Sequence, residues 1–366
     1  MKIDIKRVVV KYNGAVVGYL QEFENRKIAF QYDEDWLKNG FSISPFSLPL
    51  TEKVYISNSP HFNGLFGVFS DSLPDGWGEL LVRRMLSKEG INFDKISALT
   101  RLTIISESGL GGLSYEPIQE TKNIKLDNDL DYLAKEIEQI LSDTNSKLDL
   151  DKVFAYGGSS GGASPKAHIS INNVSWIVKF PSSTDPKNIG ELEYKANEIA
   201  KKCGIDVNEF KLFPSKKYLG FFGAKRFDRA NGKRIHMISL SSILETTHQV
   251  PNLDYVHLFQ VIQKICANKE DLYEAYRRMC FNVLYGNKDD HGKNFAFLYD
   301  ESLKGYKLSP DYDITKTSDK FEHEMTVLGI GNPTEKDLLE FALNMKLSVA
   351  KCENIIRKIK QVIANN

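Results

Sequence analysis

The spacing of apolar residues changes along this 366-residue chain, and the change limits its fold more than any other property. Apolar and polar residues alternate around turn signals in residues 8–30, which is typical of short β-strands. Apolar residues recur instead at helical spacing in residues 253–285 and 335–363. The pattern predicts an α+β fold in which a β-rich part precedes a helical part, and the length predicts two or three units.

Shorter patterns predict individual elements in the first two thirds of the chain. Asn13 and Gly14 stand between two apolar runs and predict a β-hairpin, because both residues tolerate positive φ. Residues 73–86 change to helical spacing and predict a helix. A second hairpin is predicted over residues 167–181, turning at two adjacent asparagines, with a helix following over residues 192–203.

Charge and cysteine content exclude several classes of protein. Lysine plus arginine equals aspartate plus glutamate at 48 each, so the whole chain carries no net field that would draw it to nucleic acid or to an anionic membrane. Its four cysteines are scattered without zinc-site spacing, which favours free thiols in a reducing cytoplasm. No apolar run reaches the roughly 18 to 20 residues that a membrane-spanning helix needs. We therefore expect a cytoplasmic protein with no membrane contact.

The densest group of reactive side chains is the polar segment at residues 287–294, which precedes a strand-like run. Asp289 and Asn294 have the spacing with which a kinase catalytic loop supplies an aspartate to orient a hydroxyl and an asparagine to hold Mg²⁺. A solvated surface loop is the alternative interpretation. Asp290 is the rival candidate for the catalytic base, and Asp289 is preferred because of its distance from Asn294.

Further candidates lie in and after this segment. His291 is a candidate for a catalytic or phosphate contact, although a structural role in fixing the loop is the stronger interpretation. Lys293 could stabilise the transferring phosphoryl group as a compact cation, or simply be exposed. Asp313 follows a strand-like run and is a predicted Mg²⁺ ligand with Asn294. Asp311 competes with Asp313, and the apolar residue after Asp313 favours the latter.

A glycine-rich segment at residues 156–166 is the candidate phosphate-binding loop, because successive backbone N–H groups can cradle phosphate oxygens. It matches neither the Walker A pattern nor the strict G-x-G-x-x-G spacing, so a flexible connection is the alternative. Lys179 follows in an apolar strand-like run, where nucleotide phosphates or a helix carboxylate could pair with its ammonium group. The candidate carboxylates are Glu191, Glu193 and Glu198. On an edge strand, Lys179 would instead extend to solvent.

These motifs, taken in order, resemble those of the HipA family of bacterial toxin kinases. The segments that carry the resemblance are Tyr12-Asn-Gly, Ser72-Leu-Pro-Asp-Gly-Trp77, SSGGASPKAHI, WIVKFP, AKRFDR, NKDDHGKNF and SPDYDI. The resemblance implies a protein-kinase-like two-lobed core with a small β-rich N-terminal subdomain and a helical C-terminal lobe. We expect the subdomain at residues 1–118, an N-lobe with the glycine-rich loop at 119–228, and the helical lobe with the catalytic loop and metal site at 229–366.

The same resemblance implies roles for the candidate residues, with ATP and Mg²⁺ as cofactors. Asp289 would orient or deprotonate the substrate hydroxyl, and Asn294 and Asp313 would hold Mg²⁺. Lys179 would contact the ATP phosphates, and Phe227 with the residues before it would form the adenine edge. Lys225 stands where family members often have glutamate. The part of the glycine-rich segment expected to contact the nucleotide consists of Gly161, Gly162, Ala163 and Lys166.

Family resemblance also implies regulation and partners. An inhibitory autophosphorylation is expected on a serine of the glycine-rich loop, with Ser159 the best-aligned candidate, followed by Ser160 and Ser164. A HipB-like helix-turn-helix antitoxin is the expected partner, and DNA would be contacted only through it. The expected substrate is a protein of translation such as an aminoacyl-tRNA synthetase, whose phosphorylation would arrest growth.

Two other functions fit the same residues. A kinase for a small molecule or a lipid headgroup could use the same loop and Mg²⁺ ligands, since any hydroxyl can accept a phosphoryl group. A non-catalytic corepressor could keep the kinase fold and act only through an antitoxin. The simultaneous presence of Asp289, Asn294, Asp313 and Lys179 favours catalysis over the second alternative.

Overall fold

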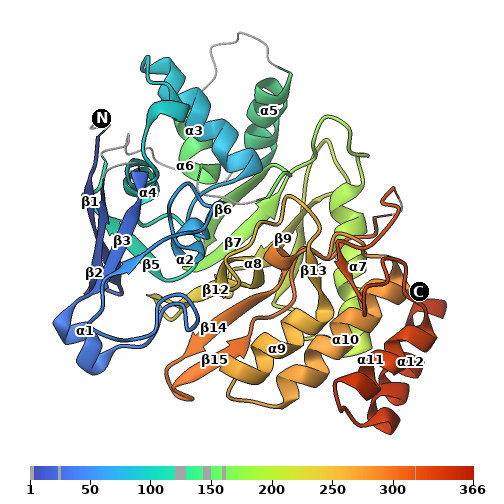
Figure 1. The fold of residues 1–366 in the computed structure, drawn as a ribbon. Helices are drawn as coiled ribbons and strands as arrows, with labels where there is room; N and C mark the ends of the chain where they lie inside the picture. The colour runs from blue at the N-terminus through green and yellow to red at the C-terminus, as the bar shows by residue number, and fades with distance from the viewer. Residues whose placement is uncertain (1–3, 24–25, 120–128, 143–149, 159–161, 318) are drawn as a thin grey trace. The chain divides into compact units, whose positions relative to one another are not determined.

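The computed structural model describes residues 4–23, 26–119, 129–142, 150–158, 162–317 and 319–366. The chain forms two compact units, the first made of Met1–Glu191 with Phe210–Ile238 and the second of Leu192–Glu209 with Ser239–Asn366. The expected α+β fold is confirmed, with a β-rich N-terminal region (Figure 1). The finer division at residues 118 and 228 stays a prediction.

A five-stranded antiparallel sheet opens the first unit. Its order is β4-β3-β2-β1-β5, with β1 at Arg7–Tyr12, β2 at Ala15–Glu22, β3 at Ile28–Tyr32, β4 at Tyr55–Ile56 and β5 at Leu113–Glu116. The hairpin predicted between β1 and β2 is confirmed: Asn13 and Gly14 form its turn with φ of +48° and +89°. These two residue types adopt positive φ at low cost, which is why the turn forms here.

A second sheet carries the expected nucleotide-binding lysine. It has the order β6-β7-β9-β8, with β6 at Lys166–Ile171, β7 at Val174–Lys179, β8 at Phe210–Phe213 and β9 at Phe221–Lys225. The predicted turn at Asn172 and Asn173 is confirmed by φ values of +51° and +61°. Because β7 pairs with both β6 and β9, it is an inner strand rather than an edge strand.

Three helices pack on this second sheet and share one core with it. They are α3 (Gly76–Lys88), α5 (Leu130–Leu141) and α6 (Leu150–Gly157), and Figure 1 shows them gathered beside β6. Trp77 and Leu81 of α3 lie in a buried cluster with Trp176 of β7. The helix predicted over residues 73–86 therefore belongs to the same core as the glycine-rich segment, which begins at the end of α6.

A buried ion cluster fixes the strand that follows β9. The Asp228 carboxylate accepts hydrogen bonds from Arg226 at 2.7 Å, Arg229 at 2.9 Å and the Gly111 N–H at 2.7 Å. Burial alone would raise the pKa of Asp228, but the two guanidinium groups hold it below its ordinary value. The AKRFDR motif thus serves structure, since it joins residues 226–229 to residues 109–111.

The remaining elements of the first unit are short. They are α1 (Glu34–Asn39), α2 (Gly67–Ser70), the 3-10 helix η2 (Phe93–Lys95), α4 (Ala98–Ile105), β10 (Arg229–Ala230) and β11 (Lys233–Arg234). Two boundaries between the units fall inside an element: one inside α7 (Ile189–Cys203) and one inside β12 (Met237–Ser239).

Helices dominate the second unit. Its principal helices are α9 (Tyr255–Ile265), α10 (Glu270–Tyr285), α11 (Glu335–Asn344) and α12 (Val349–Ala364), with α10 packed between α9 and α12 (Figure 1). The helical spacing predicted over residues 253–285 and 335–363 is interrupted once in each stretch. After α9 the Asn268 side chain accepts the Glu270 N–H at 3.0 Å, and after α11 Lys346 takes a φ of +56°.

A β-hairpin follows the polar segment in this unit. It consists of β14 (Ala296–Asp300) and β15 (Gly305–Leu308), as the two strand-like runs predicted. The smaller elements are α8 (Leu240–Ile243), the 3-10 helix η3 (Gly292–Asn294), and the parallel pair β13 (Leu253–Asp254) and β16 (Met325–Thr326). All four cysteines are free thiols. No helix in the described ranges has both the length and the apolarity to cross a membrane.

Candidate functional site: a kinase-like catalytic loop

The polar segment at residues 287–294 forms a loop with a defined start and end. Helix α10 stops at Gly286, which adopts a φ of +86°. Five residues later His291 caps η3: its Nδ1 accepts the N–H of Lys293 at 3.2 Å. The His291 ring also lies 5.4 Å from the ring of His248. These contacts give His291 a part in shaping the loop, as its structural interpretation expects.

The two adjacent aspartates of the loop have different environments. Asp290 is buried, and its carboxylate accepts hydrogen bonds from the Tyr255 hydroxyl at 2.8 Å, the His323 ring at 2.9 Å and the Glu324 N–H at 2.9 Å. The Asp289 side chain is 33% exposed and forms an ion pair with Lys320. A carboxylate already saturated with donors cannot also bind a substrate proton. Of the two neighbours, Asp289 is the one whose carboxylate reaches solvent.

Lys320 is a site residue that the sequence did not indicate. Its ammonium group contacts Asp289 and, at 2.8 Å, Glu324. Burial opposes protonation, but the hydrogen bonds to these carboxylates raise the pKa of Lys320 above its ordinary value. The lysine therefore stays charged and holds the side chain of Asp289 within the loop. No local spacing rule links positions 289 and 320, so only the tertiary fold reveals the pair.

The amide of Asn294 has a fixed orientation. Its Nδ2 donates to the main-chain oxygen of Asp289 at 2.7 Å, so Oδ1 faces the other way. The predicted spacing of Asp289 and Asn294 thus corresponds to a direct contact across the loop. Lys293, between the capping histidine and Asn294, is half-buried.

The competing aspartates after β15 also differ. Asp311 is buried, lies 3.8 Å from the Arg278 guanidinium and has a pKa raised to about 6 by burial. Asp313 is half-buried and adopts a φ of +60°, a conformation that non-glycine residues hold at a cost and that clusters at functional sites. The hydroxyl of the intervening Tyr312 donates to the main-chain oxygen of Lys293. This bond ties the segment of Asp313 to the residue next to Asn294.

The expected nucleotide-binding residues lie in the first unit. Lys179 ends β7 and is the cross-strand neighbour of Lys166, which is buried at the start of β6. Phe227 lies half-buried in the turn between β9 and β10, and Lys225 ends β9. Among the three candidate glutamates of α7, Glu193 is buried at 5% exposure, whereas Glu191 and Glu198 are half-buried.

Only the end of the glycine-rich segment can be placed. Ser159, Ser160 and Gly161 lie outside the described residues. Gly162 adopts a φ of +83°, and Ala163 and Ser164 are exposed. A Cβ on Gly162 would lie 2.7 Å from the Lys166 Nζ, which its flexible side chain can move, so it is the positive φ that favours glycine here.

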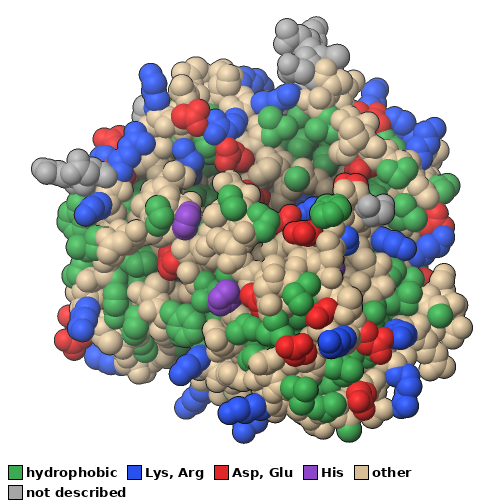
Figure 2. Space-filling model, turned by 45° about the vertical axis from the view of Figure 1, so that its right-hand side comes forward, with side chains coloured by type: hydrophobic (Ala, Val, Ile, Leu, Met, Phe, Trp, Pro, Cys, Tyr) green, Lys and Arg blue, Asp and Glu red, His purple; other side chains and the backbone are tan. Residues whose placement is uncertain are grey.

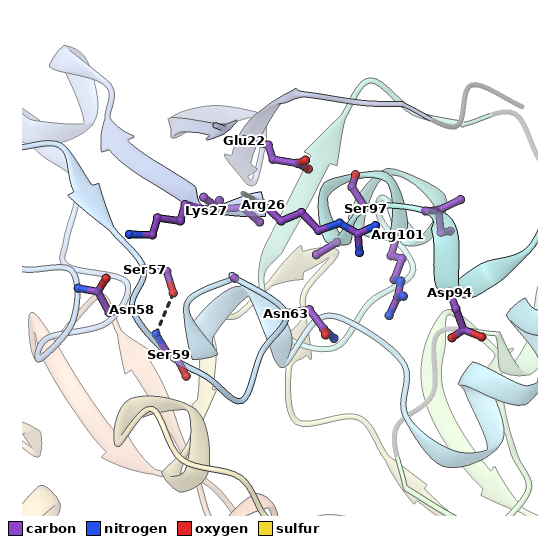
Figure 3. Close-up of a pocket in the computed structure, with 14 residues that line it drawn as sticks. Glu22, Arg26, Lys27, Ser57, Asn58, Ser59, Asn63, Asp94, Ser97 and Arg101 are labelled. Carbon is purple, nitrogen blue, oxygen red and sulfur yellow. Dashed lines mark hydrogen bonds between the residues drawn. The ribbon is translucent and has the colours of Figure 1, made fainter. Parts of the chain in front are cut away.

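A polar cavity of about 550 Å³ lies elsewhere in the first unit. Figure 3 shows Arg26, Ser97 and Arg101 along one side of it and Ser57 with Asn58 along the other. None of the residues predicted for catalysis or nucleotide binding lines it.

Positive and negative side chains are interspersed over the face drawn in Figure 2, in keeping with the balanced composition.

Comparison with known proteins identifies the family. The profile of the HipA-like C-terminal domain matches residues 158–366, which is more than half of the chain, and that of the HipA N-terminal domain matches residues 8–116. The chain belongs to the HipA family. Both matched regions contain the motifs from which the resemblance was drawn.

Individual proteins similar to this chain include a solved structure and two curated sequences. A structure of the Shewanella oneidensis HipA toxin in complex with HipB and operator DNA superposes with a TM-score of 0.73 at 20% identity, covering 98% of this chain and 90% of that one. A Sinorhizobium fredii protein provisionally named kinase Y4dM is 30% identical over 42% of this chain and 40% of its own length. A Haemophilus influenzae protein provisionally named a kinase is 28% identical over 44% of this chain and 53% of its own length. The chain thus spans about half the length of the two curated kinase sequences that it matches.

Proposed function

We propose that this HipA-family protein is an ATP- and Mg²⁺-dependent serine/threonine protein kinase. The observation that carries the proposal is the division of roles between the adjacent aspartates. Asp290 is fully engaged as a buried anchor, whereas Asp289 is partly exposed and paired with a lysine. Burying the Asp290 carboxylate is costly unless several donors compensate it. A loop that only connects two elements does not need to hold an exposed Asp289 beside such a buried anchor.

In the proposed reaction Asp289 accepts the proton of a substrate hydroxyl. The hydroxyl oxygen then forms a bond to the γ-phosphorus of ATP, the bond between that phosphorus and the β–γ bridging oxygen breaks, and ADP leaves. Lys293 supplies positive charge near the transferring group. Lys179 and Lys166, at adjoining ends of β7 and β6, provide two cations for the phosphates of the nucleotide.

The donor set fits Mg²⁺. Asn294 offers an amide oxygen whose direction is fixed by the Asp289 contact, and Asp313 offers a carboxylate. Mg²⁺ is typically held by one or two protein oxygens together with substrate phosphates rather than by a full protein cage. When bound, the ion would offset negative charge on the phosphates.

The biological setting that we propose is a toxin–antitoxin module. The support is membership of the HipA family and the likeness to a toxin in complex with HipB and operator DNA. A HipB-like antitoxin would bind this protein and contact DNA on its behalf, in agreement with the balanced charge. The substrate would be a protein of translation such as an aminoacyl-tRNA synthetase. Autophosphorylation on Ser159, Ser160 or the exposed Ser164 would inactivate the kinase.

Expression in bacteria without a partner tests this proposal. Wild-type protein should arrest growth and add phosphate to a small set of host proteins, detected by phosphoproteomics, whereas Asp289→Asn should do neither at equal protein level. Arrest by both forms would favour a non-catalytic corepressor. Arrest with phosphate found only on metabolites or lipids would favour a small-molecule kinase.

A further inference from the structure

The described end of the glycine-rich loop is held by the turn that precedes α3. The N–H of Gly162 donates to the Asp75 carboxylate, and its main-chain oxygen accepts the Trp77 N–H at 3.1 Å. Both backbone polar groups of Gly162 are therefore bonded to one short segment 87 positions earlier in the chain. This contact lies wholly within the first unit.

The Asp75 side chain has a hydrogen-bond partner that is unusual for its position in the helix. It occupies the N-cap position of α3, where an aspartate ordinarily accepts an N–H of its own helix. Within the described ranges, no side-chain hydrogen bond from Asp75 caps α3, and the carboxylate reaches the glycine-rich loop instead. A charge-assisted bond to a backbone N–H is among the stronger hydrogen bonds of proteins. Asp75 therefore bonds the glycine-rich segment at Gly162 rather than an N–H of its own helix.

Gly76 allows the two segments to come this close. It adopts a φ of +45°, and a Cβ at this position would lie 2.5 Å from the Gly162 oxygen and 2.9 Å from the Ala163 Cα. Real Cβ atoms do not approach backbone atoms so closely. Glycine is therefore required here both by its backbone conformation and by the contact with the loop.

The turn itself is rigidly anchored. Trp77 is 2% exposed and packs with Leu81 in the core that contains Trp176 of β7. At the other end of the described loop segment, the Phe180 N–H donates to the Pro165 oxygen at 2.8 Å. The described end of the loop, residues 162–165, is consequently held at Gly162 by the turn before α3 and at Pro165 by the residue that follows β7.

We propose that Asp75 and Gly76 form a clamp that sets the position of the glycine-rich loop for nucleotide binding, with Asp75 as a positioning residue. The proposal rests on the function proposed above, in which this loop covers the ATP phosphates. A glycine-rich segment loses much conformational entropy when it becomes ordered. A clamp that fixes Gly162 before ATP arrives lowers the conformational entropy lost on binding, so it should act on affinity for ATP more than on the chemical step.

The test compares four variants of the full-length protein. Asp75→Ala removes the acceptor, Asp75→Asn keeps an acceptor oxygen without charge, and Gly76→Ala adds a methyl group against the loop. Asp129→Ala is the matched control, because Asp129 is also an N-cap aspartate in the first unit but bonds the Tyr132 N–H of its own helix at 3.0 Å. Hydrogen exchange of peptides covering residues 158–166 is measured without nucleotide, and KM for ATP and kcat are measured separately.

Asp75→Ala should speed exchange at residues 158–166 and raise KM for ATP, each by about tenfold, the factor that corresponds to losing one charge-assisted bond. Its kcat should change by less than about threefold. Gly76→Ala should act in the same direction, Asp75→Asn should restore most of the wild-type behaviour, and Asp129→Ala should alter neither quantity. Exchange in β6 and β7 should stay at wild-type levels, which shows that the fold is intact.

Unchanged exchange at residues 158–166 in Asp75→Ala would overturn the clamp. Faster exchange with an unchanged KM would overturn its positioning role. If the wild-type protein neither binds nor turns over ATP, the proposed kinase function fails, while the exchange measurement still decides whether the clamp exists.

Discussion

Replacing Asp290 with alanine should unfold the second unit far more readily than the same replacement at Asp289. The Asp290 side chain has 0% exposure and accepts hydrogen bonds from Tyr255, His323 and two main-chain N–H groups at 2.8–3.4 Å. Removing it leaves these buried donors without their acceptor, which costs about 3–5 kcal/mol by analogy with broken buried ion pairs. Asp289 has one half-exposed ion pair, and its loss should cost less than about 1 kcal/mol.

The structure suggests how to measure this difference. All three tryptophans, Trp36, Trp77 and Trp176, lie in the first unit, so tryptophan fluorescence follows the unfolding of that unit. Hydrogen exchange in α9 and α10 follows the second unit. Asp290→Ala should accelerate exchange in these helices by two or more orders of magnitude, as about 3 kcal/mol requires, with little change in the fluorescence transition. Equal effects of the two substitutions would refute the assignment of separate roles.

Three further outcomes are expected. Lys320→Gln should lower kcat by about tenfold with little loss of stability, because Asp289 loses the cation that holds it; pre-steady-state phosphoryl transfer measures this. Gly292→Ala should lower activity by up to about 100-fold, because a Cβ there would lie 2.6 Å from the Leu253 Cδ1 and the Ser241 Oγ and 3.3 Å from the Ser241 main-chain N, so that these neighbours or the loop of residues 287–294 must shift; a steady-state assay with circular dichroism as the folding control checks it. His236 is fully buried, and burial lowers its pKa to about 4 from an ordinary value of 6.5. The unfolded state therefore binds a proton on His236 more tightly than the folded state does. The stability that neutral His236 contributes is complete above about pH 6.5 and falls by about 3 kcal/mol as the pH drops to about 4. Urea midpoints followed by tryptophan fluorescence should show this decline, and His236→Gln should remove most of it.

Much of the local structure could be predicted from the sequence. The turns at Asn13-Gly14 and at Asn172-Asn173 follow from the φ values these residues tolerate, and both hairpins form. The strand-like runs after residue 294 and before Ser309 likewise form the hairpin of β14 and β15. Each of these features depends on residues close together in the chain, where spacing and conformational preference carry the information.

The long-range features could not be predicted. Spacing to Asn294 favoured Asp289 over Asp290, but the partners that bury Asp290, among them Tyr255 and His323 more than thirty positions away on either side, could not be read from the sequence. The Asp75 contact with Gly162 links positions 87 apart, and nothing in the local pattern distinguishes it from an ordinary helix cap. Tertiary packing decides such choices, because burial and hydrogen-bond satisfaction are properties of the folded chain.

The rate of γ-phosphate transfer from labelled ATP in the presence of Mg²⁺, compared between wild type and Asp289→Asn, tests the catalytic assignment most directly. The account predicts transfer by the wild-type protein and a loss of about 10²–10⁴-fold in the variant, with ATP affinity changed by less than about threefold and with the unfolding transition unchanged. Transfer at the wild-type rate by folded Asp289→Asn, or no transfer by wild-type protein shown to be free of phosphate beforehand, would contradict it.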